Sequence, residues 1–190
     1  MLTAGLTLFV LSLALAADAF AAAVCQGATA TPRPGVGAAL RVGAAFGAAQ
    51  AVMPLVGWLL GAAAISIVRE FDHWVAFVLL AGIGAKMLWE ARQPSDCGPP
   101  APMMTGWALG AAALATSIDA AAAGVTLPLI GLPVLVSAAV IGLVTLTLST
   151  AGVAIGAAAG ARIGRGATLA GGVVLILLGT KILFEHLAAG

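Results

Sequence analysis

Charged residues are scarce in this sequence: aspartate, glutamate, lysine and arginine together make up 8% of its 190 residues. A soluble domain typically contains about 25% charged residues. Hydrophobic residues account for 62% of the chain, and its mean hydropathy is +1.16. A soluble fold cannot bury that much apolar surface, so the sequence is that of an integral membrane protein. At about 20 residues per membrane-spanning helix, the chain accommodates six helices and leaves no room for a soluble domain.

Several signatures of chemistry are missing as well. The sequence contains no phosphate-binding loop, nucleophile triad or Cys-x-x-Cys pair, so we expect a protein that is not an enzyme and needs no cofactor. Its two cysteines, Cys25 and Cys97, sit in dissimilar contexts and predict neither a disulfide framework nor a zinc site. The net charge of +1 gives no reason to expect a nucleic-acid partner.

Apolar runs separated by prolines, glycines and charges predict the membrane spans, at about 3–25, 38–66, 74–92, 104–127, 134–160 and 168–187. The first run lacks the basic n-region of a signal peptide, so we interpret it as a transmembrane helix. Segment 93–103 carries four prolines and is the central loop. It divides the chain into a first unit of three spans, 1–92, and a second unit of three spans, 104–190.

The two units resemble each other. A shift of 95 residues places Gly47, Gly57, Gly61, Lys86 and Glu90 on Gly142, Gly152, Gly156, Lys181 and Glu185. Because three spans are an odd number, the second copy enters the membrane from the opposite side. The sequence therefore predicts an all-α, six-helix membrane bundle of two inverted-topology three-helix repeats, with the site where the halves meet. The alternative is coincidence in a chain rich in alanine, glycine and leucine.

Each unit places one carboxylate inside a long apolar run, Asp18 in the first span and Asp119 in the fourth. A carboxylate in hydrocarbon is costly unless it faces the bundle interior, a partner or water. Small neighbours around both acids leave space for an ion. The alternative is that each acid only holds helices together by a hydrogen bond. On straight helices the two acids lie about 10 Å apart in depth, so sharing one ion requires a tilt, break or shift.

Gln50 is a third candidate ligand. Pro54, four residues later, has no N–H group, so the main-chain carbonyl of Gln50 loses its helical partner. Side-chain and main-chain oxygens at one depth suit hard or borderline ions such as magnesium or manganese. The alternative is a proline kink with an amide that faces another helix.

Hydroxyl groups and one lysine complete the candidate set. The supporting hydroxyls are Thr116, Ser117, Thr145, Ser149 and Thr150, although hydroxyls in helices more often bond to their own backbone. Lys86 either pairs with Glu90 four residues later and extends to the interface, or neutralises a site carboxylate when no metal is bound.

Basic residues in short loops predict the orientation. Arg33, Arg41, Arg92, Arg162 and Arg165 lie in or beside the first, third and fifth loops, whereas only Arg69 lies in the others. Positively charged loops stay in the cytoplasm, so both termini are expected in the periplasm.

Several segments carry a family resemblance: Asp18-Ala19-Phe20-Ala21-Ala22, Phe46 to Trp58, His73 to Leu80, Ala115 to Ala120 and Leu148-Ser149-Thr150. In order and spacing they resemble the bacterial MntP family of manganese exporters over nearly the whole chain. The resemblance implies a six-helix inner-membrane protein in which Asp18 and Asp119 match the family's intramembrane acids. Gln50 falls where the family has glutamate or glutamine. Ala16 and Ala23 replace serines that the family usually has, which implies a site poorer in oxygen donors.

Together these observations predict a secondary-type transporter that exports manganese(II) from cytoplasm to periplasm, with the ion bound by Asp18, Asp119 and Gln50 as substrate. No ATP motif is present, so an ion gradient or the membrane potential is the expected drive. One alternative is export of another divalent ion or a small cationic substrate. Another is a membrane scaffold that transports nothing. The expected partners are membrane lipid and the divalent ion, with homo-oligomer formation left open.

Overall fold

The computed structural model describes residues 2–63, 72–92, 97, 100–159, 173–174, 176–177, 180 and 184. Over these residues the chain forms helices and no strands: α1 (Leu2–Thr29), α2 (Val36–Ala63), α4 (Asp72–Arg92), α5 (Gly106–Ala115), α6 (Ile118–Thr126) and α7 (Val134–Ala159). The all-helical class is thereby confirmed for this part of the chain. The expected sixth span, 168–187, falls almost entirely outside the described residues.

Four segments of the described chain are long and apolar enough to cross a membrane: Gly5–Thr29, Val36–Ala63, Gly106–Thr126 and Val134–Ala158. Helices are the structure expected here, because hydrocarbon offers no partners for backbone N–H and C=O groups. A shorter apolar stretch, Phe77–Lys86, lies within α4. The protein is therefore a multi-pass membrane protein.

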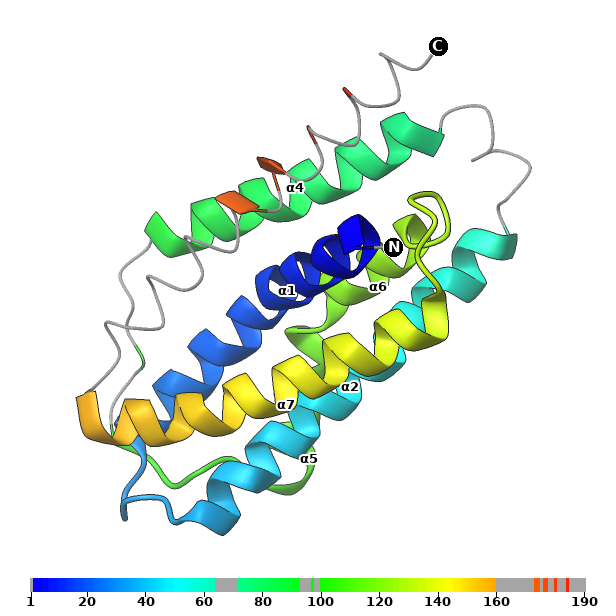
Figure 1. Ribbon diagram of the computed structural model, residues 1–190. Coiled ribbons are helices and arrows are strands. Elements are labelled where there is room, and N and C mark those ends of the chain that lie inside the picture. The colour runs from blue at the N-terminus through cyan, green and yellow to red at the C-terminus, as the bar shows by residue number, and fades with distance from the viewer. Residues whose placement is uncertain are drawn as a thin grey trace.

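Helix α7 is central to the packing (Figure 1). It runs along both α1 and α2, while α2 also contacts α5 and α6, and α4 contacts α6. Two clusters of buried apolar side chains fill the spaces between them. The first gathers side chains of α1, α4, α6 and α7 around Leu15, Leu80 and Ile141, and the second gathers side chains of α1, α2, α5 and α7 around Phe46 and Val153.

Helices α2 and α7 approach each other closely at a pair of facing glycines. A Cβ atom built on Gly47 lies 2.8 Å from the carbonyl oxygen of Gly142, and one built on Gly142 lies 2.9 Å from the carbonyl oxygen of Gly47. No side chain larger than hydrogen fits at either position without movement. Such close contact favours association in lipid, where helices gain no hydrophobic energy from leaving the acyl chains.

Glycines also mediate two further interfaces in the same way. Gly57 of α2 faces the backbone of Ala121 on α6, and Gly61 faces Val125 one turn later. On the other side of the bundle, Gly152 and Gly156 of α7 face the backbone of α1, at Phe20 and Val24 respectively. The α2–α6 and α7–α1 interfaces are therefore built from glycines at equal spacing.

The span expected to be one helix over 104–127 is interrupted. Helix α5 ends at Ala115, and α6 begins at Ile118. The N–H of Ser117 bonds to the carbonyl of Leu114, three residues back instead of four, at 3.1 Å. Ser117 has φ −107° and ψ 8°, outside the helical range, which stops the α-helical ladder. The fourth span, Gly106–Thr126, agrees with the expected 104–127, and the break places a new helix start inside it.

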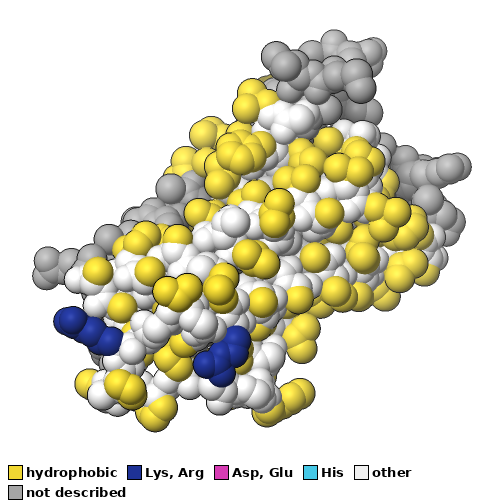
Figure 2. Space-filling model, turned by 60° about the horizontal axis from the view of Figure 1, so that its bottom comes forward, with side chains coloured by type: hydrophobic (Ala, Val, Ile, Leu, Met, Phe, Trp, Pro, Cys, Tyr) yellow, Lys and Arg dark blue, Asp and Glu magenta, His cyan; other side chains and the backbone are white. Residues whose placement is uncertain are grey.

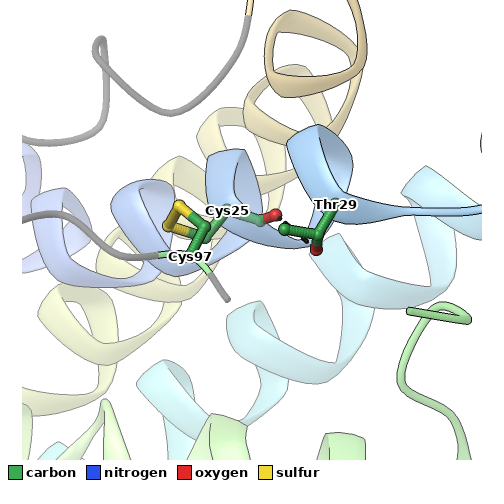
Figure 3. The surroundings of a disulfide bond; sticks show 3 residues. All are labelled: Cys25, Thr29 and Cys97. Atoms are coloured by element: carbon green, nitrogen blue, oxygen red, sulfur yellow. Dashed lines mark hydrogen bonds between the residues drawn. A yellow bond between two sulfur atoms is a disulfide. The ribbon is translucent and has the colours of Figure 1, made fainter. Parts of the chain in front are cut away.

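The expectation that the cysteines do not form a disulfide is also wrong. Cys25 near the end of α1 is bonded to Cys97 of the central loop (Figure 3), 72 residues away in sequence. Backbone hydrogen bonds hold the next part of the loop: Ala101 donates to Thr29 at 3.0 Å and accepts from Thr31 at 3.1 Å. The central loop is thus attached to one end of the bundle.

Apolar side chains dominate the exterior. Figure 2 shows one face on which the described side chains are mainly hydrophobic, and the basic groups among them lie at its lower end. The exposed large residues include Leu60, Trp89, Trp107, Leu135 and Leu143. This surface is suited to acyl chains and not to water.

Candidate ion-binding site

Asp119 lies at the start of the new helix produced by the break. It is the second residue of α6 and is 7% exposed. One carboxylate oxygen, Oδ1, accepts the N–H of Ala120 at 2.8 Å. The other oxygen, Oδ2, is buried and has no hydrogen-bond partner. The N-terminus of a helix carries partial positive charge, so the break favours a carboxylate at this position and leaves one oxygen available.

Two other charged side chains act on the Asp119 carboxylate. Asp18 of α1 exerts a repulsive field on it, and Lys86 of α4 an attractive one. Asp18 is half-buried, whereas Lys86 is exposed. The two acids that the sequence places in separate spans therefore come within electrostatic range of each other, and Lys86 comes within range of Asp119. For the two acids to share one ion, the sequence requires a tilt, a break or a shift of the helices, and the fourth span has such a break.

Gln50 is fully buried in α2 and bonded to α1. Its amide nitrogen, Nε2, donates to the carbonyl oxygen of Leu15 at 3.1 Å. Its amide oxygen, Oε1, is buried without a partner. Pro54, one turn later, is inside α2 and cannot donate to the Gln50 carbonyl. Gln50 thus presents a fixed, unpaired oxygen. Its partner Leu15 lies three residues before Asp18 on α1.

The five supporting hydroxyls divide into two groups. Thr145 and Ser149 of α7 are fully buried, and neither oxygen has a hydrogen-bond partner. The other three bond to carbonyls three or four residues earlier: Thr116 to Ala112 and Ala113, Ser117 to Ala113, and Thr150 to Leu146, at 2.7–3.1 Å. The first group has free acceptor and donor capacity, whereas the second has already used its protons.

Two buried polar residues were missed by sequence reasoning. The hydroxyl of Ser137 on α7 and the amide oxygen of Gln26 on α1 are both buried without a partner. A serine in an apolar run usually bonds to the carbonyl four residues earlier, so the sequence gives no sign that Ser137 does not. Gln26 sits one residue after Cys25, in a position that the sequence assigns to the end of a span.

The unpaired oxygens share a chemical character. Carboxylate, amide and hydroxyl oxygens are hard ligands that suit magnesium, manganese and calcium, whereas thiolate and imidazole favour zinc, copper or iron. No cluster of three or more His, Cys, Asp or Glu side chains occurs in the portion of the chain that the structure describes. Any ion held here is therefore bound by few charged groups and several neutral oxygens.

A multi-pass helical bundle with carboxylate, amide and hydroxyl oxygens left unpaired in its interior belongs to the class of membrane proteins that handle polar or charged solutes. Residues 33–183 match the model of the Mntp family, described as "Putative manganese efflux pump". The chain belongs to this family.

Curated relatives agree with that assignment over nearly their full length. A protein of Rhodopseudomonas palustris (strain BisA53) is 47% identical over 180 residues, covering 93% of this chain and 92% of that protein. One from Sorangium cellulosum (strain So ce56) is 49% identical over 185 residues, covering 95% and 96%. One from Pseudomonas aeruginosa (strain LESB58) is 45% identical over 185 residues, covering 96% and 97%. Each is named "Putative manganese efflux pump MntP". No solved structure matches the chain.

Proposed function

We propose that this protein exports manganese(II) across the bacterial inner membrane, from cytoplasm to periplasm, as a secondary-type transporter. The name shared by its relatives supports the substrate and direction. The observation that carries the mechanism is the Asp119 carboxylate, which is buried, acted on by the charge of Asp18, and left with an unpaired oxygen. Two like charges in a low-dielectric interior repel strongly unless a cation neutralises them. A divalent ion bound between Asp18 and Asp119 removes that repulsion.

The ligand set of the proposed site contains oxygen only. Asp18 and Asp119 supply charge, and Oε1 of Gln50 supplies a neutral ligand whose orientation is fixed by the bond to Leu15. Thr145 and Ser149 add hydroxyls with no competing partner. Thr116, Ser117 and Thr150 retain acceptor lone pairs, but their protons are engaged, so they contribute less. Water completes the coordination of an ion that prefers six ligands.

Lys86 takes the place of the ion when the site is empty. Its charge attracts the Asp119 carboxylate, and its helix, α4, packs against α6. A divalent ion that enters displaces this attraction, and release of the ion restores it. The exchange keeps the interior close to neutral at every stage, which lowers the cost of holding two acids within the bilayer.

We further propose that the two units form inverted-topology repeats that rock about the α2–α7 crossing. Support comes from glycine contacts related by two sequence shifts, the shift of 95 residues and a shift of 101 residues that places Asp18 on Asp119. Gly47 and Gly142, which a shift of 95 equates, meet each other at the crossing. Gly57 meets Ala121 just as Gly152 meets Phe20, and a shift of 101 equates Phe20 with Ala121. A twofold axis through the crossing produces this pairing, and transporters built this way alternate access at the axis.

The orientation follows the arginines, with both termini in the periplasm and Arg33 and Arg41 at the cytoplasmic end. The Cys25–Cys97 disulfide lies at that same end. Because the cytoplasm keeps thiols reduced, the proposed orientation requires this pair to exist as two thiols in growing cells. The drive is an ion gradient or the membrane potential, since the sequence has no ATP motif.

Manganese tolerance tests the proposal in cells. In a strain that lacks its own exporter, the wild-type gene should restore growth at high manganese, and Asp18→Asn and Asp119→Asn should each abolish it while still inserting. Cellular metal content under graded metal stress separates manganese from another divalent ion or a small cationic substrate. Restored tolerance by both variants would remove the two-carboxylate mechanism. An absence of manganese flux in liposomes that contain the purified protein would favour the scaffold alternative.

A further inference from the structure

Six hydroxyl side chains are buried in the described part of the chain, and they fall into two groups. Three donate to a carbonyl three or four residues earlier in the chain: Ser12 to Leu8 at 2.7 Å, Ser117 to Ala113 at 2.7 Å and Thr126 to Ala123 at 2.8 Å. The other three have no partner, and they are Ser137, Thr145 and Ser149. All three unpaired hydroxyls belong to α7.

The three unpaired hydroxyls follow one ridge of that helix. Positions 137, 141, 145 and 149 are separated by four residues each, which places them in a single i, i+4 row. From Ser137 to Ser149 the row rises about 18 Å at ~1.5 Å per residue. That distance is more than half of the hydrocarbon core, which is about 30 Å thick. All four side chains are 0% exposed, so the row faces protein and not lipid.

An unpaired hydroxyl at this depth requires an explanation. Hydroxyls in helices can bond to the carbonyl three or four residues earlier, as other hydroxyls of this protein do. A buried polar group without a partner costs free energy, and native proteins rarely leave one unpaired. Three such groups in one row therefore leave hydrogen-bonding capacity for water and for a solute that carries water.

Ile141 interrupts this row. It lies between Ser137 and Thr145 on the ridge, and it packs in the apolar cluster with Leu15 and Leu80. A buried apolar side chain between two polar positions excludes water, and hydrophobic constrictions of this type close channels by dewetting.

We propose that this ridge of α7 lines the route of a hydrated divalent cation through the bundle. In this scheme Ser137 is a lining residue between the cation site and the α6–α7 end, and Ile141 is the barrier that separates Ser137 from the site around Thr145. The proposal rests on the proposed transport function and extends it, because it assigns roles to two residues outside the ligand set. It requires water to reach Ser137 without passing Ile141.

Cysteine accessibility tests the route independently of transport. Purified protein in detergent, with Cys25 and Cys97 kept as the disulfide, is treated with a small water-soluble cationic methanethiosulfonate. Ser137→Cys should react at least about tenfold faster than Ser12→Cys, a difference of ~1.4 kcal/mol in barrier. Ser12 is the matched control because it is equally buried but already bonded to its helix. Equal rates for the two variants would overturn the proposal.

The barrier has its own test. Thr145→Cys alone should react slowly with the reagent. Combining it with Ile141→Ala should raise the reaction rate at least about tenfold. Combining it with Leu80→Ala, which opens a cavity of similar size off the ridge, should leave the rate unchanged. Saturating manganese should slow the faster reaction. If Ile141→Ala and Leu80→Ala act alike, Ile141 is packing and not a barrier. An absence of manganese flux in the wild-type protein contradicts the proposed function. The labelling rates are measured without transport, so they still test whether the α7 ridge is a water-accessible route with a barrier at Ile141.

A flux measurement covers the case in which a cysteine variant fails to fold. Ser137→Ala removes one atom and should lower manganese flux at least about threefold, with unchanged melting temperature, because one polar contact is lost from the route. Ser12→Ala should leave flux unchanged. Equal flux for Ser137→Ala and wild type contradicts a lining role for Ser137.

Discussion

The amide nitrogen of Gln50 on α2 donates a hydrogen bond to the carbonyl oxygen of Leu15 on α1, across 3.1 Å of fully buried interface. The bond decides which way the amide faces, because nitrogen and oxygen occupy opposite corners of the same planar group. With the nitrogen directed at α1, the oxygen is left unpaired in the interior. A residue that holds two helices together therefore also serves as a prearranged neutral ligand.

Substitutions of Gln50 should separate these two roles. Gln50→Met removes both the donor and the oxygen at similar volume, so manganese transport should fall at least about tenfold. The lost hydrogen bond should also destabilise the protein by about 1 kcal/mol. Gln50→Glu keeps an oxygen and adds charge, so it should retain more transport than Gln50→Met. The measurements are manganese flux in proteoliposomes and the melting temperature in detergent. Higher flux for Gln50→Met than for Gln50→Glu contradicts the ligand role.

The glycine crossing predicts where a methyl group is not tolerated. Gly47→Ala and Gly142→Ala each push a Cβ against the carbonyl of the opposite helix, so each should destabilise by about 1–3 kcal/mol through overpacking. Gly110 on α5 has nothing within 4 Å of a built Cβ and is the matched control. Gly110→Ala should be neutral or stabilising, since alanine is the better helix former. Thermal unfolding in detergent checks all three, and similar melting temperatures for Gly47→Ala and Gly110→Ala disagree with the close crossing.

Removing Lys86 should strengthen manganese binding. Lys86→Gln eliminates the charge that competes with the ion for Asp119, so the manganese dissociation constant should fall at least about threefold, or ~0.7 kcal/mol. Transport should slow at the same time, because the empty protein has lost the charge that balances its acids. Manganese-dependent shifts of the melting temperature report the affinity. Arg41→Gln, in an exposed residue at the start of α2, is the control and should change neither quantity. Weaker binding in Lys86→Gln contradicts the competition.

The disulfide provides a test of orientation. If both termini are periplasmic, Cys25 and Cys97 face the reducing cytoplasm and should be free thiols in growing cells. Acid quenching followed by alkylation with a maleimide polymer should then add two labels per chain, and air oxidation after purification should abolish both. Blocked cysteines in the freshly quenched cells contradict the orientation taken from the arginines.

The same bond should matter for stability once formed. It joins the central loop to α1, so reduction or Cys97→Ser should lower the free energy of unfolding of the oxidised protein by about 2–4 kcal/mol, as disulfides usually contribute. The backbone bonds of Ala101 to Thr29 and Thr31 remain to hold the loop. Thermal unfolding with and without reductant checks this. An unchanged melting temperature means that these backbone bonds alone are sufficient.

The helical class was predictable, because composition and hydropathy determine it. The break before Asp119 was not: Thr116-Ser117 contains neither proline nor glycine, and back-bonding hydroxyls like theirs also occur inside the unbroken helices α1 and α7. The disulfide was also beyond reach, since 72 residues separate Cys25 from Cys97 and only tertiary packing brings them together.

The candidate site could be predicted only in part, because the cost of burying a side chain differs between residue types. Two acids and a glutamine in apolar runs are costly, so their types alone mark them as candidates. A serine in an apolar run costs little when it bonds to its own helix, so Ser137 carries no such mark. Which hydroxyls are left unpaired depends on the direction of each side chain, and that is decided by neighbouring helices and not by local sequence.

Manganese flux into proteoliposomes that contain a manganese-quenched dye tests the central claim most directly. Wild-type protein and Ser12→Ala should quench the dye at the same rate, whereas Asp18→Asn and Asp119→Asn should each fall to the rate of protein-free vesicles. Each variant must elute and melt like a folded protein. Wild-type flux in both asparagine variants would contradict the account, because the paired carboxylates would then not be the groups that carry the ion.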